Sequence, residues 1–278
     1  MKQVWFITGA SKGLGLTLVK RLLAEGHSVA ATSRDAATLI QNVGGANPRL
    51  LPLEVNLSDE DSVESAVSLA IERFGHIDTL VNNAGYGQTG AVEEVSDQEV
   101  RENFEVNVFG LLTVTRAVLS RMREKRSGHI YNISSIGGFT GAFSGWGIYC
   151  ATKFAVAGLT ESLHADVKDL GIQVTLVYPG YFRTSFLEKE SMRRPERTIA
   201  GYEEAKRSIE HHSSTLNRQQ PGDPEKLAKV LIDLSHRADA PLHLFLGTDA
   251  YELAHVKMKN VTSDLEKNRN LSVTTGYT

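Results

Sequence analysis

A short apolar run, a glycine-rich turn and an amphipathic pattern follow one another at the start of this chain. The apolar run is Val4–Ile7, and it leads directly into Thr8-Gly9-Ala10-Ser11-Lys12-Gly13-Leu14-Gly15. Apolar residues then recur at helical spacing until Gly26 interrupts the pattern; they are Leu16, Val19, Leu22 and Leu23. This order of strand, turn and helix predicts the first unit of a parallel α/β sheet.

Strand-like and helix-like stretches continue to alternate along most of the 278 residues. We expect further strands at 28–33, 50–55, 77–81, 129–133, 172–178 and 242–246. We expect helices at 60–74, 97–126, 149–170, 224–237 and 249–268. The alternation predicts an α/β fold with a three-layer, Rossmann-type, doubly wound parallel sheet of about seven strands in a single domain.

One segment breaks this alternation. Residues 185–221 are polar, charged and helical mainly over 197–210, a composition typical of a mobile substrate flap rather than of a core. We therefore expect one Rossmann-fold domain over residues 1–250 that includes this flap. Residues 251–278 would add a C-terminal helical extension and a loose tail to the same domain.

The composition favours a cytoplasmic protein without a membrane span. With 41% hydrophobic residues and a net charge of −3, the chain can build a core and gives no reason to expect nucleic acid as a partner. Its single cysteine, Cys150, excludes an internal disulfide framework and is better explained as a buried helix residue than as a reactive thiol. No apolar run approaches the ~18 residues of a membrane span, and no signal-peptide pattern precedes the first strand.

The glycine turn suits a dinucleotide, because its backbone N–H groups can approach a pyrophosphate at a helix N-terminus. The spacing is G-x-x-x-G-x-G, and the glycines could instead only shape a tight turn. The second strand ends at Ser33-Arg34, and Lys12 lies in the turn. Two cations with no acid before them favour NADP(H) over NAD(H). Alternatively, Arg34 is an ordinary loop cation and Asp35 begins the next helix.

A tyrosine and a lysine, Tyr149 and Lys153, are four residues apart in an expected helix and therefore share one face. A free tyrosine titrates near pH ~10, and a nearby ammonium favours the phenolate. The pair suits proton transfer at neutral pH. Each residue also has a structural explanation, as a packed aromatic and a surface cation.

With these features together, the sequence resembles the short-chain dehydrogenase/reductase family in its compact single-domain branch, over roughly residues 3–250. The glycine turn is similar to the family's cofactor loop, and Asn82-Asn83-Ala84-Gly85 to its N-N-A-G signature. The remaining matches are Asn107, Ser135, Tyr149, Lys153 and the segment Pro179-Gly180-Tyr181-Phe182-Arg183-Thr184.

The resemblance implies a site for NADP(H) and a proton relay, with no metal. The implied catalytic residues are Ser135, Tyr149, Lys153 and Asn107, the last as the holder of a relay water. The implied cofactor contacts are Thr8, Gly9, Ser11, Lys12, Gly13, Leu14, Gly15, Arg34, Asn56, Leu57, Asn83, Ala84, Gly85, Tyr149, Lys153, Pro179, Gly180 and Thr184. The family also implies a homo-oligomer, a dimer or a tetramer.

Three departures from the family pattern matter. Asn56 stands where an aspartate usually contacts adenine, and an amide oxygen can still accept a hydrogen bond there. The interval from Ser135 to Tyr149 is one residue longer than the family leads us to expect, which leaves Ser134 as an alternative. The C-terminal helix is long, which puts the usual family tetramer in doubt.

The function that follows is an NADP(H)-dependent oxidoreductase that interconverts a ketone or aldehyde and an alcohol. An epimerase or dehydratase of the same fold and a non-catalytic nucleotide sensor are the alternatives. Loop 137–147, residues around Gln88 and Tyr181, and the flap would set specificity for a small-molecule substrate. Six aromatic residues suggest a bulky hydrophobic ketone, although core packing could explain half of them. They are Phe139, Phe143, Trp146, Tyr181, Phe182 and Phe186.

Overall fold

The computed structural model describes residues 2–277 and contains a seven-stranded parallel sheet with strand order β3-β2-β1-β4-β6-β7-β9. The order reverses beside β1, as in a doubly wound sheet, so the predicted fold class is confirmed. The strands are β1 (Val4–Ile7), β2 (Ser28–Ser33), β3 (Leu50–Glu54), β4 (Thr79–Asn82), β6 (Gly128–Ile133), β7 (Ile172–Pro179) and β9 (His243–Leu246). A separate two-stranded sheet pairs β5 (Gly87–Gln88) with β8 (Met192–Arg193).

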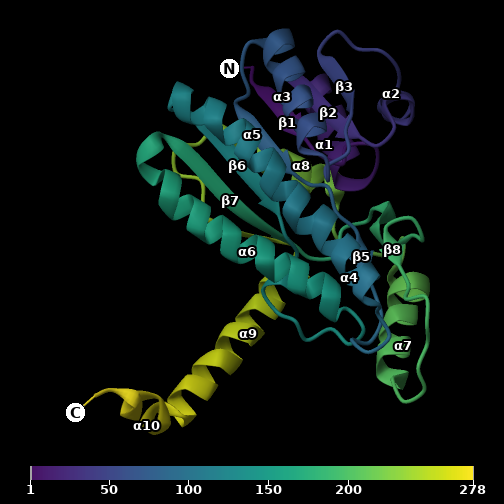
Figure 1. Cartoon of the computed structure of the whole chain (residues 1–278), viewed down its shortest axis with the longest axis vertical. Coiled ribbons are helices and arrows are strands. Elements are labelled where there is room, and N and C mark those ends of the chain that lie inside the picture. Colours follow the sequence, from purple (N-terminus) through teal and green to yellow (C-terminus); the bar gives the residue numbers. More distant parts are fainter. Residues whose placement is uncertain (1, 278) are drawn as a thin grey trace.

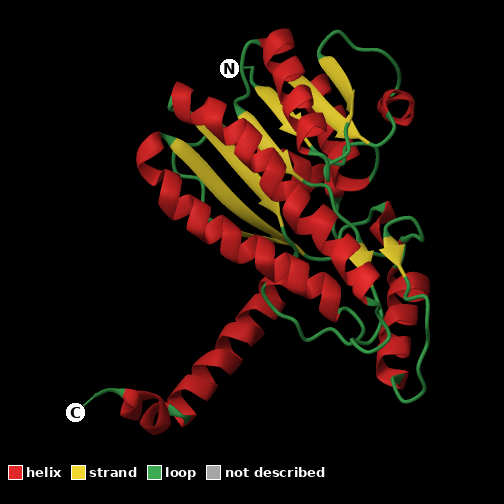
Figure 2. Cartoon of the chain, in the orientation of Figure 1, coloured by secondary structure: helices red, strands yellow, loops and turns green. Residues whose placement is uncertain are grey.

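Helices cover both faces of the large sheet (Figures 1 and 2). The α-helices are α1 (Gly13–Ala24), α2 (Ala36–Val43), α3 (Glu60–Phe74), α4 (Asp97–Phe104), α5 (Gly110–Lys125), α6 (Gly147–Val167), α7 (Glu203–Glu210), α8 (Pro224–Ser235), α9 (Thr248–Lys267) and α10 (Arg269–Ser272). Short 3₁₀ turns occur at Ile136–Gly138, Lys168–Leu170, Ser185–Leu187 and Val273–Thr275.

Strand β1 shows how the two faces of the core are built. Trp5 and Ile7 point into a cluster shared with α1 and α8, whereas Phe6 points into a cluster shared with α3 and α5. Because both faces of the sheet are covered, the strands are mostly apolar on both sides, which is typical of parallel sheets. Side-chain caps begin several helices, including Asp59 for α3 and Asp223 for α8. Each such cap contributes about 1 kcal/mol.

The helix predicted over 97–126 has an interruption. Between α4 and α5 the backbone forms a π-helical turn, Glu105–Phe109, which contains Asn107. Wide turns of this kind are rare and concentrate at functional sites. Gly110 follows the turn, and a Cβ there would lie 2.9 Å from the Cβ of Leu57, so the turn brings α5 unusually close to the loop after β3.

A few residues of the flap 185–221 belong to the core, which its polar composition did not predict. Leu187, Met192 and Ile209 are buried and pack in one cluster with Trp146 and Tyr149. Composition conceals this because few apolar residues carry the packing. A π-helical turn, His211–Leu216, follows α7.

The helix predicted from residue 197 starts only at Glu203. The guanidinium of Arg197 donates to the main-chain oxygen of Glu94, and the carboxylate of Glu94 accepts from the N–H of Ile199. These contacts hold residues 197–199 in a non-helical segment against the loop after β5. Tertiary hydrogen bonds therefore override the helical composition of this stretch.

Helix α9 projects away from the body of the molecule (Figure 1). Only its beginning is packed, where Ala250 and Ala254 are buried against Ile136. The predicted C-terminal extension is therefore present, and part of the expected loose tail is helical as α10. No helix within residues 2–277 is long and apolar enough to cross a membrane.

Candidate active site

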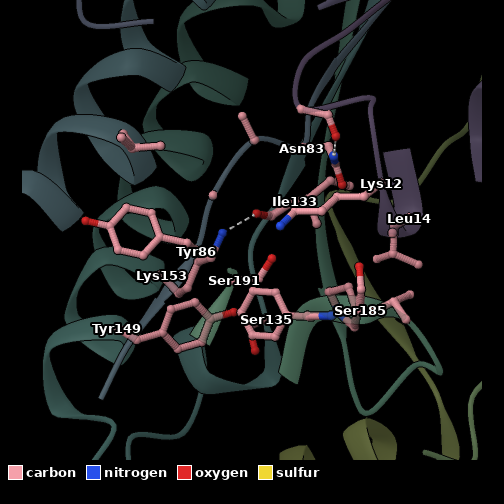
Figure 3. Close-up of a pocket in the computed structure, with 18 of the residues that line it drawn as sticks. Lys12, Leu14, Asn83, Tyr86, Ile133, Ser135, Tyr149, Lys153, Ser185 and Ser191 are labelled. Carbon is pink, nitrogen blue, oxygen red and sulfur yellow. Dashed lines mark hydrogen bonds between the residues drawn. The ribbon is translucent and has the colours of Figure 1, made fainter. Parts of the chain in front are cut away.

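One cleft runs along the carboxyl ends of the parallel strands, where ligands bind in sheets of this topology (Figure 3). It extends from Arg34, after β2, past Tyr149 and Lys153 of α6, to His212 in the flap. Most of the predicted site residues line it. Those that do are Gly9, Ser11, Lys12, Gly13, Leu14, Arg34, Asn56, Leu57, Asn83, Ala84, Gly85, Ser135, Tyr149, Lys153, Pro179, Gly180 and Thr184.

The glycine turn is shaped by close backbone approaches. Gly9 has a φ of +65°, and a Cβ there would lie 2.7 Å from the Cα of Ala84. Gly15 faces inward instead, where a Cβ would lie 2.5 Å from the carbonyl oxygen of Gly9. Gly13 has a φ of +58° and open space beside it, with the nearest atom to a Cβ, from Thr184, 3.8 Å away. The cleft therefore approaches the backbone at Gly13, and Gly15 supports the turn from behind.

Thr8 and Asn83 join the turn to the end of β4. The hydroxyl oxygen of Thr8 accepts from the N–H groups of Asn83 and Ala84 at 3.0 and 3.1 Å. The amide nitrogen of Asn83 donates to the carbonyl oxygens of Thr8 and Gly9, both at 3.0 Å. Thr8 is 2% exposed and does not line the cleft. The predicted contact at Thr8 is therefore a support, as at Gly15, because its hydroxyl is used within the protein.

At the end of β2, basic residues line the cleft and the neighbouring acid is used in a helix cap. Lys12, Ser33 and Arg34 line the cleft. The carboxylate of Asp35 instead caps α2 by accepting from the N–H groups of Ala37 and Thr38. The expectation that Asp35 begins a helix is thus confirmed alongside the placement of Arg34 in the cleft. Burial lowers the pKa of Lys12 and Arg34 lowers it further, whereas Glu190 raises it.

Lys153 and Tyr149 lie side by side in the middle of the cleft (Figure 3). The ammonium of Lys153 donates to the carbonyl oxygen of Ile133 at 2.9 Å and is 5.8 Å from the centroid of the Tyr149 ring. Burial lowers the pKa of Lys153 to about 8. Burial also raises the pKa of Tyr149, and a hydrogen bond with Ser135 opposes that rise. The expected depression of the tyrosine pKa is therefore wrong for the protein alone, because desolvation outweighs it.

The two candidate serines after β6 have different surroundings. The hydroxyl of Ser134 donates to the main-chain oxygen of Lys153 at 2.9 Å and is buried. Ser135 accepts from the N–H of Gly137 at 3.0 Å and lines the cleft with Tyr149, where it opposes the rise in the pKa of that tyrosine. The structure thus brings Ser135 to the tyrosine, whereas Ser134 braces α6.

Asn107 lies behind the cleft rather than in its wall. Its amide oxygen accepts from the N–H of Tyr86 at 3.0 Å. Its amide nitrogen donates to the carbonyl oxygen of Tyr86 at 2.9 Å and to the hydroxyl of Thr152 at 3.0 Å. These bonds fix the segment after β4 against α6. They also occupy the side chain, which leaves no support for a relay water held by the side-chain amide.

Comparison with known proteins decides the family. The sequence model of the short chain dehydrogenase family matches residues 3–195. The chain belongs to the short-chain dehydrogenase family. Oxidoreductase BOA17 of Botryotinia fuckeliana is 34% identical over 98% of this chain and 99% of that protein. A 3-ketodihydrosphingosine reductase of Bacteroides thetaiotaomicron is 40% identical over 68% of each protein.

Solved structures agree with this assignment. A short-chain dehydrogenase from Streptomyces avermitilis has a TM-score of 0.89 at 34% identity, covering 100% of this chain and 99% of that one. ElxO with NADP bound has a TM-score of 0.73 at 26% identity, covering 88% and 97%. A 3-ketoacyl-(acyl-carrier-protein) reductase from Brucella melitensis complexed with NADH has a TM-score of 0.72 at 26% identity, covering 88% and 96%. Nicotinamide dinucleotides of both kinds thus occur among these neighbours.

The residues of this short-chain dehydrogenase fit such a cofactor. An ammonium has three hydrogens to donate, and the buried Lys153 has one protein acceptor, Ile133. Burying a charge with so few partners is costly, so ribose hydroxyls would complete its coordination. The open approach at Gly13 and the cations Lys12 and Arg34 suit the phosphates.

Aromatic residues of this short-chain dehydrogenase also line the cleft. Of the six predicted aromatics, five line the cleft, namely Phe143, Trp146, Tyr181, Phe182 and Phe186. Phe139 packs instead against Tyr178 and Phe245 in the core. Gln88 itself is 1% exposed, lies outside the cleft and donates to Thr89 and Glu99, whereas Tyr86, near it in the chain, lines the cleft.

Two site features of this dehydrogenase were missed from the sequence. His212 lines the cleft, and the carboxylate of Asp249, at the start of α9, accepts from the N–H of Tyr181 at 2.6 Å. No local motif marks either residue, because their partners lie 31 and 68 positions away along the chain. The only available signal for His212 was its place within the predicted flap.

Proposed function

We propose that this protein is an NADP(H)-dependent oxidoreductase that interconverts a ketone or aldehyde and an alcohol. The observation that carries the proposal is the placement of Ser135 and Tyr149 in the same cleft as the buried ammonium of Lys153. This arrangement offers a neutral proton donor and a second hydrogen-bond donor to one carbonyl oxygen. When bound, the cofactor supplies or accepts the hydride.

The proton step belongs to Tyr149. Because burial favours the uncharged phenol, the side chain keeps its proton until an acceptor forms beside it. In the reduction direction, Tyr149 donates that proton to the oxygen of the substrate as negative charge develops there. Ser135 orients the same oxygen, and oxidation of an alcohol follows the reverse path.

Lys153 acts on the phenolate that Tyr149 leaves behind. An ammonium in a buried site stabilises a developing negative charge more strongly than it would in water. Lys153 would also hold the nicotinamide ribose. For Asn107, the hydrogen bonds to Tyr86 and Thr152 support a positioning role, and a relay through its side chain is not favoured.

Arg34 and Lys12 are the residues that favour NADP(H) over NAD(H). A 2′-phosphate carries extra negative charge, and both cations line the end of the cleft where β2 terminates. The withdrawal of Asp35 into the cap of α2 removes the acid that would repel such a phosphate. Asn56 and Leu57 line the same end, where they would contact the adenine.

The substrate proposed here is a bulky, apolar carbonyl compound. The relatives include a 3-ketodihydrosphingosine reductase, and Trp146, Phe143 and Phe186 form an aromatic wall beside Tyr149. Two alternatives to the reductase are kept: an epimerase or dehydratase of the same fold, and a nucleotide sensor. We place the protein in the cytoplasm.

We also propose that the protein forms homo-oligomers through α9. Five residues of α9 form a stripe with alternating spacings of three and four, as in a coiled coil. They are Tyr251, Ala254, Met258, Val261 and Leu265. The C-terminal part of this stripe is exposed to solvent, with Met258, Val261 and Leu265 at 46%, 42% and 61% exposure.

A second copy of the same helix fits this stripe. Lys257 and Asp264 flank it along one edge, seven positions apart in the sequence. In an antiparallel pair about a two-fold axis, each lysine would face the aspartate of the other copy. Helix α9, the arm that projects from the body, would then join two molecules without involving the cleft.

The proposed activity is tested with the full chain, NADPH and a panel of ketones. We expect loss of NADPH fluorescence with long-chain or cyclic apolar ketones. A protein that binds NADPH tightly but oxidises it with no ketone or aldehyde of the panel would instead be a sensor. Turnover of a sugar nucleotide without net cofactor oxidation would favour the epimerase alternative.

A further inference from the structure

A second polar pair, Tyr181 and His212, lies in the cleft beyond the proton donor. The hydroxyl of Tyr181 and Nε2 of His212 are 2.9 Å apart, and Nδ1 of His212 is 2.7 Å from the carbonyl oxygen of Ser208. A carbonyl oxygen can only accept, so Nδ1 carries a hydrogen. Burial lowers the pKa of His212, which favours the neutral ring with a bare Nε2. Tyr181 therefore donates its hydrogen to His212.

This direction determines what Tyr181 can offer to a ligand. A tyrosine hydroxyl has one hydrogen, and His212 takes it. Burial raises the pKa of Tyr181 to about 12, so the hydroxyl keeps this hydrogen at neutral pH. The lone pairs of the oxygen remain, and they accept hydrogen bonds but cannot donate them. A ligand group that meets Tyr181 must itself be a donor.

The surroundings of the pair are aromatic and apolar. The rings of Trp146 and His212 have centroids 4.8 Å apart, and the rings of Trp146 and Tyr149 have centroids 5.7 Å apart. Phe186 is 5.6 Å from Tyr149 by the same measure. Trp146 therefore links the pair to the proton donor through direct ring contacts. A polar group recognised by Tyr181 would lie on the same ligand as the carbonyl that meets Tyr149.

Charges near this part of the cleft do not suit an anionic ligand. The guanidinium of Arg193 lies 4.2 Å from the centroid of the Tyr86 ring and binds the carboxylate of Glu102 at 3.2 Å. The carboxylate of Asp249 acts on the hydroxyl of Tyr181 and adds to the rise in its pKa. The second group of the ligand is thus better uncharged.

We propose that the substrate is an apolar ketone with a second, uncharged hydrogen-bond donor, a hydroxyl group, which binds to the hydroxyl oxygen of Tyr181. His212 is the positioning residue that holds Tyr181 as an acceptor. The proposal rests on the carbonyl reductase activity proposed above and defines its substrate class.

The test compares matched ketones. Hydroxy derivatives of 2-dodecanone, with the hydroxyl moved along the chain, are each paired with their methyl ether, which accepts but does not donate. We expect one position at which the hydroxy ketone exceeds its ether about tenfold in kcat/KM, the effect of one buried hydrogen bond. Equal values at every position would overturn the proposal.

Variants separate recognition from a purely structural role of the Tyr181–His212 bond. Tyr181→Phe and His212→Leu should each bring the ratio of hydroxy ketone to ether close to one. His212→Gln supplies an amide oxygen as acceptor and should restore the preference. His211→Leu changes the exposed neighbouring histidine and should leave the ratio unchanged. A fall in both activities with the ratio preserved in Tyr181→Phe would show that the bond only holds the flap.

Failure of this proposal is distinguishable from failure of the activity. Binding of the corresponding diols and their monomethyl ethers to the protein with NADP⁺, by calorimetry, gives the same comparison without turnover. No ketone turnover with a preserved preference for diols would refute the reductase but keep the subsite. Turnover without preference, or no preference in binding, would refute the subsite.

Discussion

The carboxylate of Asp249 accepts a hydrogen bond from the backbone N–H of Tyr181 at 2.6 Å. This contact joins the start of α9 to the loop after β7, which lines both the cofactor end and the substrate end of the cleft. The two residues are 68 positions apart. A Cβ at Gly180 would lie 2.3 Å from the same carboxylate, so the loop fits around it closely. The C-terminal helix therefore helps to shape the site although most of α9 lies away from it.

Removal of this carboxylate should destabilise the fold. We expect Asp249→Ala to lower the free energy of unfolding by about 1.5–3 kcal/mol, the contribution of a hydrogen bond to a charged group. Asp249→Asn keeps an acceptor oxygen and should lose less. Urea denaturation measures both, with Glu252→Ala on the exposed face of α9 as the control. Equal stability of Asp249→Ala and the control would mean that the contact is energetically silent.

Tyr149→Phe should lower kcat for ketone reduction by roughly 10²–10⁴-fold, the range for removal of a general acid. Binding of NADPH should persist, because the change removes one hydroxyl. Tyr178→Phe is the matched control, since Tyr178 is buried outside the cleft and packs against Phe245. Steady-state kinetics and a fluorescence titration make the comparison. A wild-type rate in Tyr149→Phe would remove this residue as the proton donor.

The activity should depend on the ammonium of Lys153. Its pKa is lowered to about 8 in the folded protein, so the charge is lost as the pH rises through that value. Because the ammonium stabilises the tyrosinate, we expect kcat/KM for reduction to fall above pH 8. The Lys153→Arg variant stays charged and should move the fall in kcat/KM to higher pH. Because a guanidinium has a different geometry from an ammonium, the maximum rate of this variant should be lower.

The same shift has a consequence for stability. The unfolded chain keeps its lysine proton up to the ordinary pKa of 10.5, whereas the folded chain releases it near 8. Between these values the unfolded state binds more protons, so this group makes the free energy of unfolding rise with pH. Lys153→Met should abolish that contribution in denaturation measured across this range. A pH dependence identical to the wild type would contradict the assigned burial effect.

Arg34→Ala should weaken NADPH binding about 10–100-fold, as expected for the loss of charge-assisted hydrogen bonds to a phosphate. The effect of this substitution on NADH binding should be small, so the preference for NADPH over NADH should decrease. Arg49→Ala removes an exposed cation outside the cleft and serves as the control. Titration of NADPH and NADH into the wild type and both variants measures the change. An unchanged preference in Arg34→Ala, or a preference for NADH in the wild type, would contradict the NADP(H) assignment.

The arm formed by α9 predicts a change in assembly. Leu265→Asp places a charge in the exposed stripe, and we expect it to lower the molecular mass in sedimentation equilibrium. Val256→Asp makes the same change on the opposite face of the helix, where the exposed fraction is 55%. We expect that variant to keep the wild-type mass. Loss of assembly in both variants, or in neither, would argue against this face as the interface.

The sequence alone was sufficient for the fold and for the centre of the site. Mostly apolar strands and amphipathic helices are local patterns, and their alternation predicts a doubly wound sheet whose cleft lies at the strand ends. Tyr149 and Lys153 share a face because four residues make about one helical turn. The resemblance added Ser135, which the structure brings to the tyrosine.

The tertiary structure decided what depends on contacts between distant segments. It turned Asp35 into a cap, occupied the amide of Asn107 and brought His212 to Tyr181. It also decided the sign of the shift at Tyr149, because the pKa of a group depends on how completely the fold removes it from water. Periodicity records which face of an element is apolar. Periodicity does not show which atoms come into contact across the cleft, and those contacts determine the chemistry.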